Sequence, residues 1–325
     1  MARRRRSKLP LVAVVLLVVG ALGWLAGGWV STGPLESQIE FDVGAGAGLS
    51  VLSDDLETQG AIRSATLFKL RASLLGGGTE VRKGSFLIPK GASEATILEI
   101  LKGDKVIRRL ITIPEGMPSI MVAERLMANK DLTGPVSTPG EGTVLPDSYD
   151  WQKGEPRAAV LKRMQAAMDK TLAELWAKRS PRTVAKTPQE ALILASIVEK
   201  ETGKPEERRM VAGLYSNRVR QGMLLQADPT IIYPITKGKP LGRRIRQSEI
   251  QAVNGYNTYT MVGLPNGPIT NPGRASIAAV LDPAETEALF MVADGTGGHV
   301  FADTLEQHNA NVAKWFALRK ARGEL

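Results

Sequence analysis

The chain has 325 residues, of which 43% are hydrophobic and 23% are charged. This length and composition exclude a disordered chain and allow one large domain together with a small one. The sequence contains no cysteine, so disulfide bridges, thiolate metal sites and cysteine nucleophiles are excluded as well. We therefore expect a globular protein that is held together by its apolar core.

The first thirty residues join a basic cluster to a long apolar run. Five positive charges within residues 1–8 are followed by an uncharged segment, 9–30. This segment predicts a single transmembrane helix, because a spanning helix needs about 20 apolar residues. By the positive-inside rule, residues 1–8 form a basic tail in the cytoplasm, and the chain after the helix lies outside the inner membrane, on the periplasmic or extracytoplasmic side. A cleaved signal peptide is the alternative, with small residues at 26–28, but its apolar segment is shorter.

The charge balance argues against a nucleic-acid partner. The formal net charge of +9 falls to +4 once the five charges before the apolar run are set aside. A net charge of +4 on the part of the chain after the apolar run gives little support to nucleic-acid binding. It suits an anionic polymer only weakly, and an ordinary solvated surface explains it equally well.

Residues 36–104 predict a small module of mixed helices and strands, after a short linker at 31–36. The helix at its end has a clear start signal, because Ser93 can act as an N-cap and Gly103 ends the apolar pattern. The expected elements are helices at 50–59 and 64–75, a strand at 84–88 and a helix at 93–102.

Residues 106–325 predict the main domain, also of mixed α+β type. Its first part contains an alternating segment, two helical patterns and a stretch rich in Pro, Gly, Ser and Thr. We expect a strand at 106–113, a helix at 119–128, a loop at 133–142 and an amphipathic helix at 156–178.

The most informative helix follows. Thr187 is a good N-cap, Pro188 suits the first helical position, and Glu190 completes a reciprocal capping box. Residues 191–198 are then apolar almost all round the helix. Such a segment belongs in the core of the domain.

Two carboxylates end this helix, Glu199 and Glu201. At about 100° per residue they point about 200° apart, and Glu201 is the one that falls on the apolar stripe. Burial there raises the pKa of a carboxyl group and keeps it protonated near neutral pH, as an acid that cleaves a glycosidic bond must be. The alternative is a solvated helix end, where Glu201 caps the helix or pairs with Lys200, Lys204 or Arg208.

The last third of the chain is rich in loops that carry polar and aromatic side chains, at 225–230, 256–259 and 263–269. Rigid Pro and Gly loops of this kind suit sugar recognition, because rings stack on pyranose faces and amides bond to hydroxyls. The alternative is that Pro and Gly only shape the turns.

Metal and cofactor sites find no support in the sequence. His299 and His308 have no carboxylate at ligand spacing, so we expect structural roles for both and no metal. Asp303 is the expected N-cap of the final helix. The glycines 76–78 lack the Lys-Ser/Thr of a phosphate-binding loop, and no cofactor is expected.

Together these motifs resemble one family, the endolytic murein transglycosylases, also called YceG-like proteins, over essentially the whole chain. The departures are small: Phe86 stands where the family has Tyr, and Asn266 stands where it has a second Pro. Besides the basic start and the apolar run, the resemblance rests on the segments 84–88, 113–116, 145–149, 195–202, 225–230, 256–259 and 298–301.

The resemblance implies a transmembrane helix, a LysM-like module and a lytic transglycosylase domain with a lysozyme-like catalytic centre. It implies that Glu201 is the catalytic residue, the second glutamate of a Glu-Lys-Glu sequence. It also implies that further residues line the cleft, although Asp228 could instead cap a turn at Pro229. These substrate-binding candidates are Gln226, Asp228, Tyr233, Asn257, Thr258 and Tyr259.

The implied activity is that of a lyase that cuts the MurNAc–GlcNAc bond within nascent peptidoglycan strands. One carboxyl group is enough, because the MurNAc 6-hydroxyl attacks in place of water and leaves a 1,6-anhydro end. Such cuts limit strand elongation, and the family's association with peptidoglycan synthases and division proteins makes these expected partners. A non-catalytic peptidoglycan-binding scaffold with an inert Glu201 is the alternative.

Overall fold

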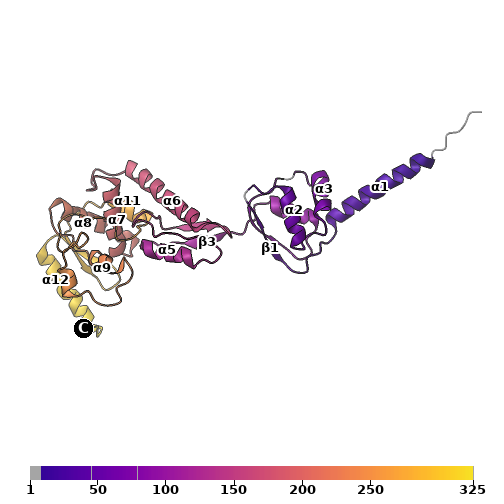
Figure 1. The fold of residues 1–325 in the computed structure, drawn as a ribbon. Helices are drawn as coiled ribbons and strands as arrows, with labels where there is room; N and C mark the ends of the chain where they lie inside the picture. Colours follow the sequence, from indigo (N-terminus) through magenta and orange to yellow (C-terminus); the bar gives the residue numbers. More distant parts are fainter. Residues whose placement is uncertain (1–8, 45, 79, 325) are drawn as a thin grey trace, which may run out of the picture. The chain divides into compact units, whose positions relative to one another are not determined.

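The computed structural model of the chain describes residues 9–44, 46–78 and 80–324. The chain divides into two compact units between Arg109 and Leu110 (Figure 1). The expected basic tail, residues 1–8, lies outside the described residues. Both units mix helices and strands, so the α+β prediction is confirmed at this level.

Unit 1 is a small sheet covered by helices and preceded by one long helix. Strands β1 and β2 pair antiparallel, with Phe41 opposite Phe86. Both rings are 0% exposed, which suits phenylalanine at position 86, because a buried tyrosine hydroxyl would need a partner there. The elements are α1 (Leu9–Val30), β1 (Ile39–Val43), α2 (Leu49–Thr58), α3 (Ala65–Leu75), β2 (Gly84–Ile88) and α4 (Glu94–Lys102).

Helix α1 has the bounds expected for the transmembrane segment. Its stretch Val12–Val30 is long and apolar enough to cross a bilayer. Its end also joins the core of unit 1, where Trp29 is only 9% exposed and packs with Phe68 at a ring-centroid distance of 6.1 Å.

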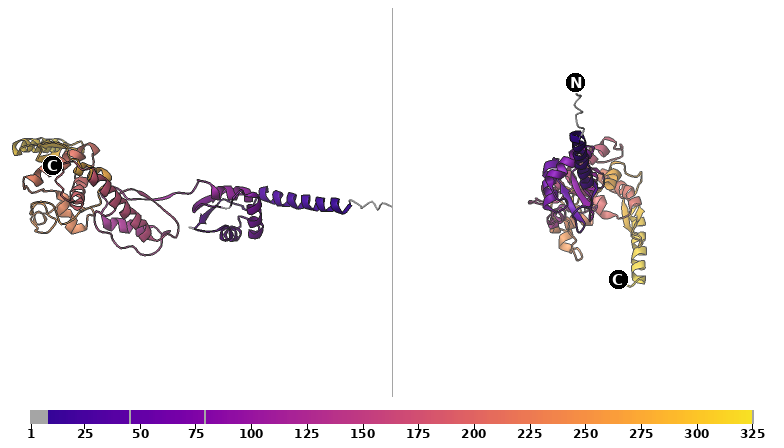
Figure 2. Two further views of the ribbon diagram at one scale, coloured as in Figure 1. Left: turned by 90° about the horizontal axis from the view of Figure 1, so that it is seen from above. Right: turned by 90° about the vertical axis from the view of Figure 1, so that its right-hand side faces the viewer.

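Unit 2 is built round a buried helix, α7, which packs against α8 and α11 (Figure 1). Helix α12 lies at the outside of the unit, against β5 and β6 (Figure 2). Its elements are β3 (Arg109–Thr112), α5 (Ser119–Ala128), β4 (Ser148–Trp151), α6 (Arg157–Ala177), α7 (Pro188–Glu201), the 3-10 helix η1 (Pro205–Glu207), α8 (Arg208–Arg220), α9 (Asp228–Thr236), α10 (Gln247–Ile250), α11 (Arg274–Leu281), β5 (Phe290–Ala293), β6 (His299–Ala302) and α12 (Leu305–Ala321).

Some sequence predictions need correction. Strand β1 was missed, and the strand expected at 106–113 is only β3, because the segment bonds to two different partners. The Ile107 N–H donates to the Ser85 carbonyl at 2.7 Å, whereas the Ile113 N–H donates to the Asp147 carbonyl at 2.8 Å.

Two helix starts also differ from the prediction. Thr304, not Asp303, caps the final helix, because its hydroxyl accepts from the Gln307 N–H at 3.2 Å. Glu190 accepts from the Lys186 N–H at 2.6 Å, one residue before the N–H that a reciprocal capping box would use.

Candidate active site

Helix α7 carries Glu201 to the inside of unit 2. The Thr187 hydroxyl accepts from the Glu190 N–H at 3.1 Å and so fixes the start of the helix. All eight residues of the segment 191–198 are buried, as its apolar pattern predicts. Glu201 is the last residue of α7. Its position is therefore fixed by a helix whose preceding turns are packed in the core.

Glu201 opens onto a polar cavity of about 250 Å³. The cavity is formed where α7, α8 and the start of α9 meet β5 and β6. Its lining residues are Glu201, Leu214, Tyr215, Arg218, Gln226, Asp228, Tyr259, Met291, Val292, Ala293 and His299.

The surroundings of Glu201 favour the neutral form of its carboxyl group and so raise its pKa above the ordinary value of glutamate. Burial, and then the negative charge of Asp228, raise the pKa of Glu201 to about 7, against opposing contributions from a Tyr215 hydrogen bond and the Arg218 charge. Its Oε1 atom is buried without a hydrogen-bond partner among the described residues. Glu201 can therefore exist as an acid and as a base near neutral pH.

Tyr215 and Arg218 form the polar wall behind Glu201. Tyr215 is 2% exposed, and burial raises the pKa of its hydroxyl well above the usual value, so it stays a hydrogen-bond donor. The Arg218 guanidinium donates to the carbonyls of Leu289 and Leu225, each at 2.7 Å. The cation next to the acid is thus fixed in place by the backbone.

Asp228 lies in the same cavity at the start of α9. Its Oδ1 accepts from the Tyr259 hydroxyl at 2.6 Å, and Asp228 is the first residue of the helix, after the N-cap Ala227. A second carboxylate near Glu201 is not expected from the sequence, and it comes from the packing of α9 against α7.

Replacing Asp228 with Asn is expected to lower the pKa of Glu201, because it removes a negative charge that disfavours ionisation. Side-chain carboxyl titration by NMR measures this pKa directly. The exposed Asp169 of α6 provides a matched control, since Asp169→Asn removes the same charge elsewhere in unit 2. An unchanged Glu201 pKa in Asp228→Asn would contradict the coupling.

Gln226 reaches the cavity from an unusual backbone conformation. Its φ is 52°, in the left-handed region, and its N–H donates to the Thr258 carbonyl at 3.1 Å. Its side chain is exposed and lines the cavity. Of the six expected substrate-binding residues, the structure therefore brings Gln226, Asp228 and Tyr259 together with Glu201.

The other three expected substrate-binding residues do not line this cavity. Asn257 and Thr258 are 0% exposed. Asn257 donates to the carbonyls of residues 249, 250 and 252, and the Thr258 hydroxyl lies 2.8 Å from that of Thr230. They hold the loop that presents Tyr259.

Tyr233 also lies outside the lining of this cavity. Its ring packs against Tyr256 at a centroid distance of 4.8 Å, and its hydroxyl hydrogen-bonds to Glu141. Burial raises the pKa of Glu141.

Glu199 has a different environment from Glu201, as the helix projection predicts. Its side chain is 5% exposed, and its Oε1 lies 3.8 Å from the Arg208 guanidinium. Its Oε2 accepts from the Gly273 N–H at 2.8 Å. Glu199 therefore fastens the start of α11 to α7 and does not line the cavity.

His299 is a cavity residue that the sequence analysis assigned only a structural role. Its Nδ1 lies 2.9 Å from Oε2 of Glu207, and its backbone N–H donates to Oε1 of the same carboxylate at 2.8 Å. The Thr202 hydroxyl donates to Glu207 as well, at 2.9 Å. Tyr215 and Arg218 were also missed, although their three-residue spacing on one helix indicated a shared face.

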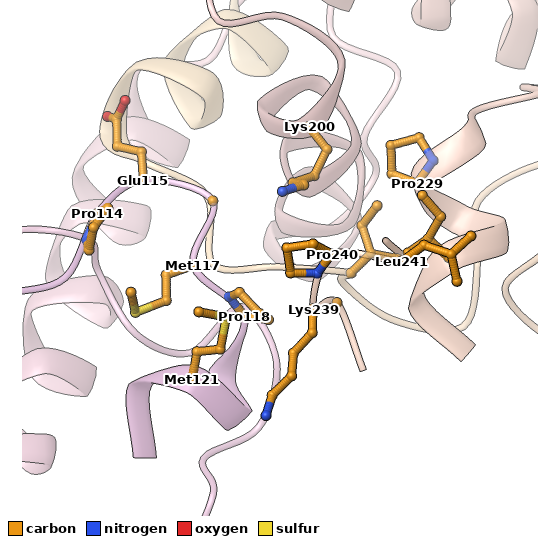
Figure 3. A pocket seen from close by; sticks show the side chains of 14 residues that line it. Pro114, Glu115, Met117, Pro118, Met121, Lys200, Pro229, Lys239, Pro240 and Leu241 are labelled. Carbon is orange, nitrogen blue, oxygen red and sulfur yellow. The ribbon is translucent and has the colours of Figure 1, made fainter. Parts of the chain in front are cut away.

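A second pocket of about 430 Å³ lies near the first in unit 2. In Figure 3 the loop that carries Met117 and Pro118 faces the segment that carries Lys239 and Pro240, with Lys200 above them. Its lining is mainly Pro, Met and Leu, and Glu201 is not part of it. The smaller cavity is the better candidate for chemistry, because it contains the acid with the raised pKa.

Among the described residues, no group of three or more His, Asp or Glu side chains is placed to hold a metal ion. The cavity instead combines one desolvated acid with hydroxyl, amide and guanidinium donors. Such a set can donate a proton to a leaving oxygen and bind the hydroxyls of a polar substrate.

Comparisons with known proteins identify the family of this chain. The model of the YceG-like family matches residues 41–314, so the chain belongs to this family. Two Streptococcus pneumoniae proteins named endolytic murein transglycosylase are each 28% identical over 83% of this chain, which spans 57% of their length. A Bacillus subtilis protein of the same name is 23% identical, over 88% of this chain and 87% of its own length.

A crystal structure of a YceG-like protein from Listeria monocytogenes has the same fold. The match covers 85% of this chain and 99% of that chain, with a TM-score of 0.53 and 23% identity. The match to the family model confirms the resemblance found in the sequence at the level of the family.

Proposed function

We propose that this chain is a membrane-anchored endolytic lytic transglycosylase that cuts the MurNAc–GlcNAc bond within peptidoglycan strands. The observation that carries this proposal is the protonatable Glu201 at the end of α7, which lines a polar cavity and has a pKa of about 7. The names of the Streptococcus and Bacillus relatives support it.

In the first step Glu201 acts as the acid. Its proton goes to the oxygen between MurNAc and GlcNAc as the bond from that oxygen to MurNAc C1 breaks. The Glu201 carboxylate formed in this step is stabilised by hydrogen bonding from Tyr215 and by the charge of Arg218.

In the second step the same carboxylate acts as the base. It takes the proton of the MurNAc 6-hydroxyl while O6 bonds to C1, which leaves a 1,6-anhydro end and returns Glu201 to its neutral form. A pKa near 7 suits both roles, because neither form of the carboxyl group is strongly disfavoured at neutral pH.

The two units divide the work of binding and cleavage in this proposal. The catalytic domain, residues 106–325, supplies the lysozyme-like centre, which lies in unit 2 with Gln226, Asp228 and Tyr259 beside the acid. Residues 36–104 form a LysM-like glycan-binding module, and the β1–α2–α3–β2 order with paired outer strands supports this assignment.

Helix α1 is the membrane anchor in this proposal, with its N-terminus in the cytoplasm and both units outside. Its length and hydropathy support a single span. Trp29 packs in the core of unit 1, and the Arg71 guanidinium lies 5.3 Å from the Trp24 ring centroid, which supports a helix that stays attached. An anchored enzyme would meet nascent strands near the peptidoglycan synthases and division proteins that the family resemblance implies.

The presence of Asp228 in the cavity supports a second candidate function, which is hydrolysis of the same bond. A carboxylate across a cleft from an acid can activate water or form a glycosyl intermediate, and both routes end in a reducing sugar. The Asp228 carboxyl group lines the same cavity as Glu201, and its Oδ1 accepts a hydrogen bond from the Tyr259 hydroxyl. The two reactions use the same acid and differ in the nucleophile.

Product analysis in ¹⁸O-labelled water tests the proposal. The full chain in detergent is incubated with purified glycan strands, and the new ends are identified by mass spectrometry. Anhydro ends without ¹⁸O support the transglycosylase. Reducing ends that carry ¹⁸O would replace it with a hydrolase, and binding without cleavage would replace it with the non-catalytic scaffold.

A further inference from the structure

Helices α3 and α4 of unit 1 pack directly against the last two turns of α1. Trp29 enters its core, and Arg71 of α3 lies over the Trp24 ring. The guanidinium approaches so closely at Gly28 that a Cβ there would lie 2.0 Å from its Nη2 atom. Arg71 is itself buried and bonds to Glu94 of α4 at 2.9 Å. The end of α1 is therefore part of unit 1 and not a flexible tether.

Helix α3, which lies beside α1, has an exposed apolar stripe. Leu67, Leu70 and Leu74 follow the spacing of one helix face. Leu70 is 46% exposed and Leu74 is 64% exposed. The polar flank of α3 faces α2 instead, where Lys69 lies 3.4 Å from Asp54. The leucine stripe thus lies on the flank of α3 that includes Arg71 and its contact with α1.

The length of α1 fixes the depth at which this contact occurs. At about 1.5 Å per residue, Val12–Val30 covers about 28 Å, close to the roughly 30 Å of a bilayer's hydrocarbon core. Trp24 precedes Val30 by about 9 Å on the same scale. Because Arg71 contacts Trp24, α3 lies beside the outermost part of the apolar span.

The surroundings of α3 match the chemistry of a lipid headgroup layer. Trp24 is 60% exposed, and tryptophan is enriched at that layer. Cations stand at both ends of α3: Arg63 bonds to the Thr32 carbonyl just after α1, at 3.4 Å, and Lys102 bonds to the Gly76 carbonyl at 2.9 Å. Such side chains reach phosphate groups while their stems cover apolar surface.

We propose that unit 1 rests on the outer leaflet of the membrane that α1 spans, with the Leu70 and Leu74 face of α3 inserted at the headgroup boundary. The partner of this surface is a phospholipid bilayer. The proposal depends on the anchor proposed above, and it adds a second, lateral contact that fixes the orientation of unit 1 on the membrane.

Single spin labels test this contact, and the absence of cysteine from the chain makes each label unique. Leu70→Cys and Leu74→Cys probe α3, while Leu22→Cys, at a position 60% exposed on α1, reports on the span itself. Leu87→Cys on β2 is the matched control, because Leu87 is 45% exposed and Leu70 is 46% exposed. The labelled full chain is reconstituted in vesicles of phosphatidylethanolamine and phosphatidylglycerol, and collision with oxygen is compared with collision with a water-soluble nickel chelate.

We expect the labels at 22, 70 and 74 to collide more often with oxygen, and the label at 87 to collide more often with the nickel chelate. A label at 22 in lipid with labels at 70 and 74 in water would overturn the lateral contact and leave the anchor intact. A label at 22 in water would overturn the anchor, and the lateral contact with it. Labels at 70, 74 and 87 that all behaved alike would also contradict a contact specific to α3.

Discussion

The variant Glu201→Gln is expected to lower the rate at which new strand ends form by at least about a hundredfold, the usual contribution of a positioned acid or base. The amide keeps the shape of the side chain but has no acidic proton to give to the leaving oxygen. The measurement is the amount of new ends released per minute from purified glycan strands. A variant with more than a tenth of the wild-type rate would remove Glu201 from the mechanism.

The matched control is Glu199→Gln, two residues earlier on the same helix. Its amide oxygen can still accept from the Gly273 N–H, and the change weakens only the charge interaction with Arg208 across 3.8 Å. We expect a smaller loss of rate than for Glu201→Gln. The reverse ranking would show that the catalytic group has been assigned to the wrong glutamate.

The same Glu201→Gln variant is expected to be more stable than the wild type at pH 8. The pKa of Glu201 rises from its ordinary 4.5 to about 7 in the folded protein. The folded state therefore binds more protons than the unfolded state between these values, and wild-type stability falls as the pH rises through this window. At about 1.4 kcal/mol per pKa unit, the ionised side chain costs about 3 kcal/mol above pH 7, a cost that the neutral amide does not carry.

Thermal unfolding at pH 4.5 and at pH 8 measures this difference. The two proteins should unfold at similar temperatures at pH 4.5, where Glu201 is protonated in the folded state. At pH 8 the variant should unfold several degrees higher, since each kcal/mol moves Tm by about 2 to 4 °C in a domain of this size. An equal difference at both pH values would contradict a raised pKa for Glu201.

The parts of the site that could be predicted from the sequence are those set by local interactions. Thr187, Pro188 and the apolar run before Glu201 define the start, the type and the burial of α7 within one short segment. The bounds of α1, α5 and β2 were likewise predictable, because each depends on composition or periodicity within the element. Helix periodicity also predicted that Glu201 and Glu199 point in different directions, and the two side chains contact different groups.

The parts that could not be predicted depend on packing between distant segments. Asp228 reaches Glu201 only because α9 packs against α7, and His299 enters the cavity on a strand almost a hundred residues after Glu201. The contacts of Asn257 depend on the folded loop in the same way, because its side-chain amide donates to the carbonyls of Ile250 and Ala252.

Asn266 shows how a departure from the family pattern can be accommodated. Its N–H donates to the Gly255 carbonyl at 2.8 Å, a bond that the family's proline could not make. The loop therefore has a hydrogen bond that a proline at this position would remove.

Gln226 lines the cavity from a backbone conformation that is unfavourable for a residue other than glycine. A residue with a Cβ at a φ of 52° carries backbone strain of about 1 kcal/mol, which glycine would avoid. Glycine, however, would leave the wall of the cavity without an amide. The strained backbone at this position therefore places an amide, which can both donate and accept hydrogen bonds, beside Glu201.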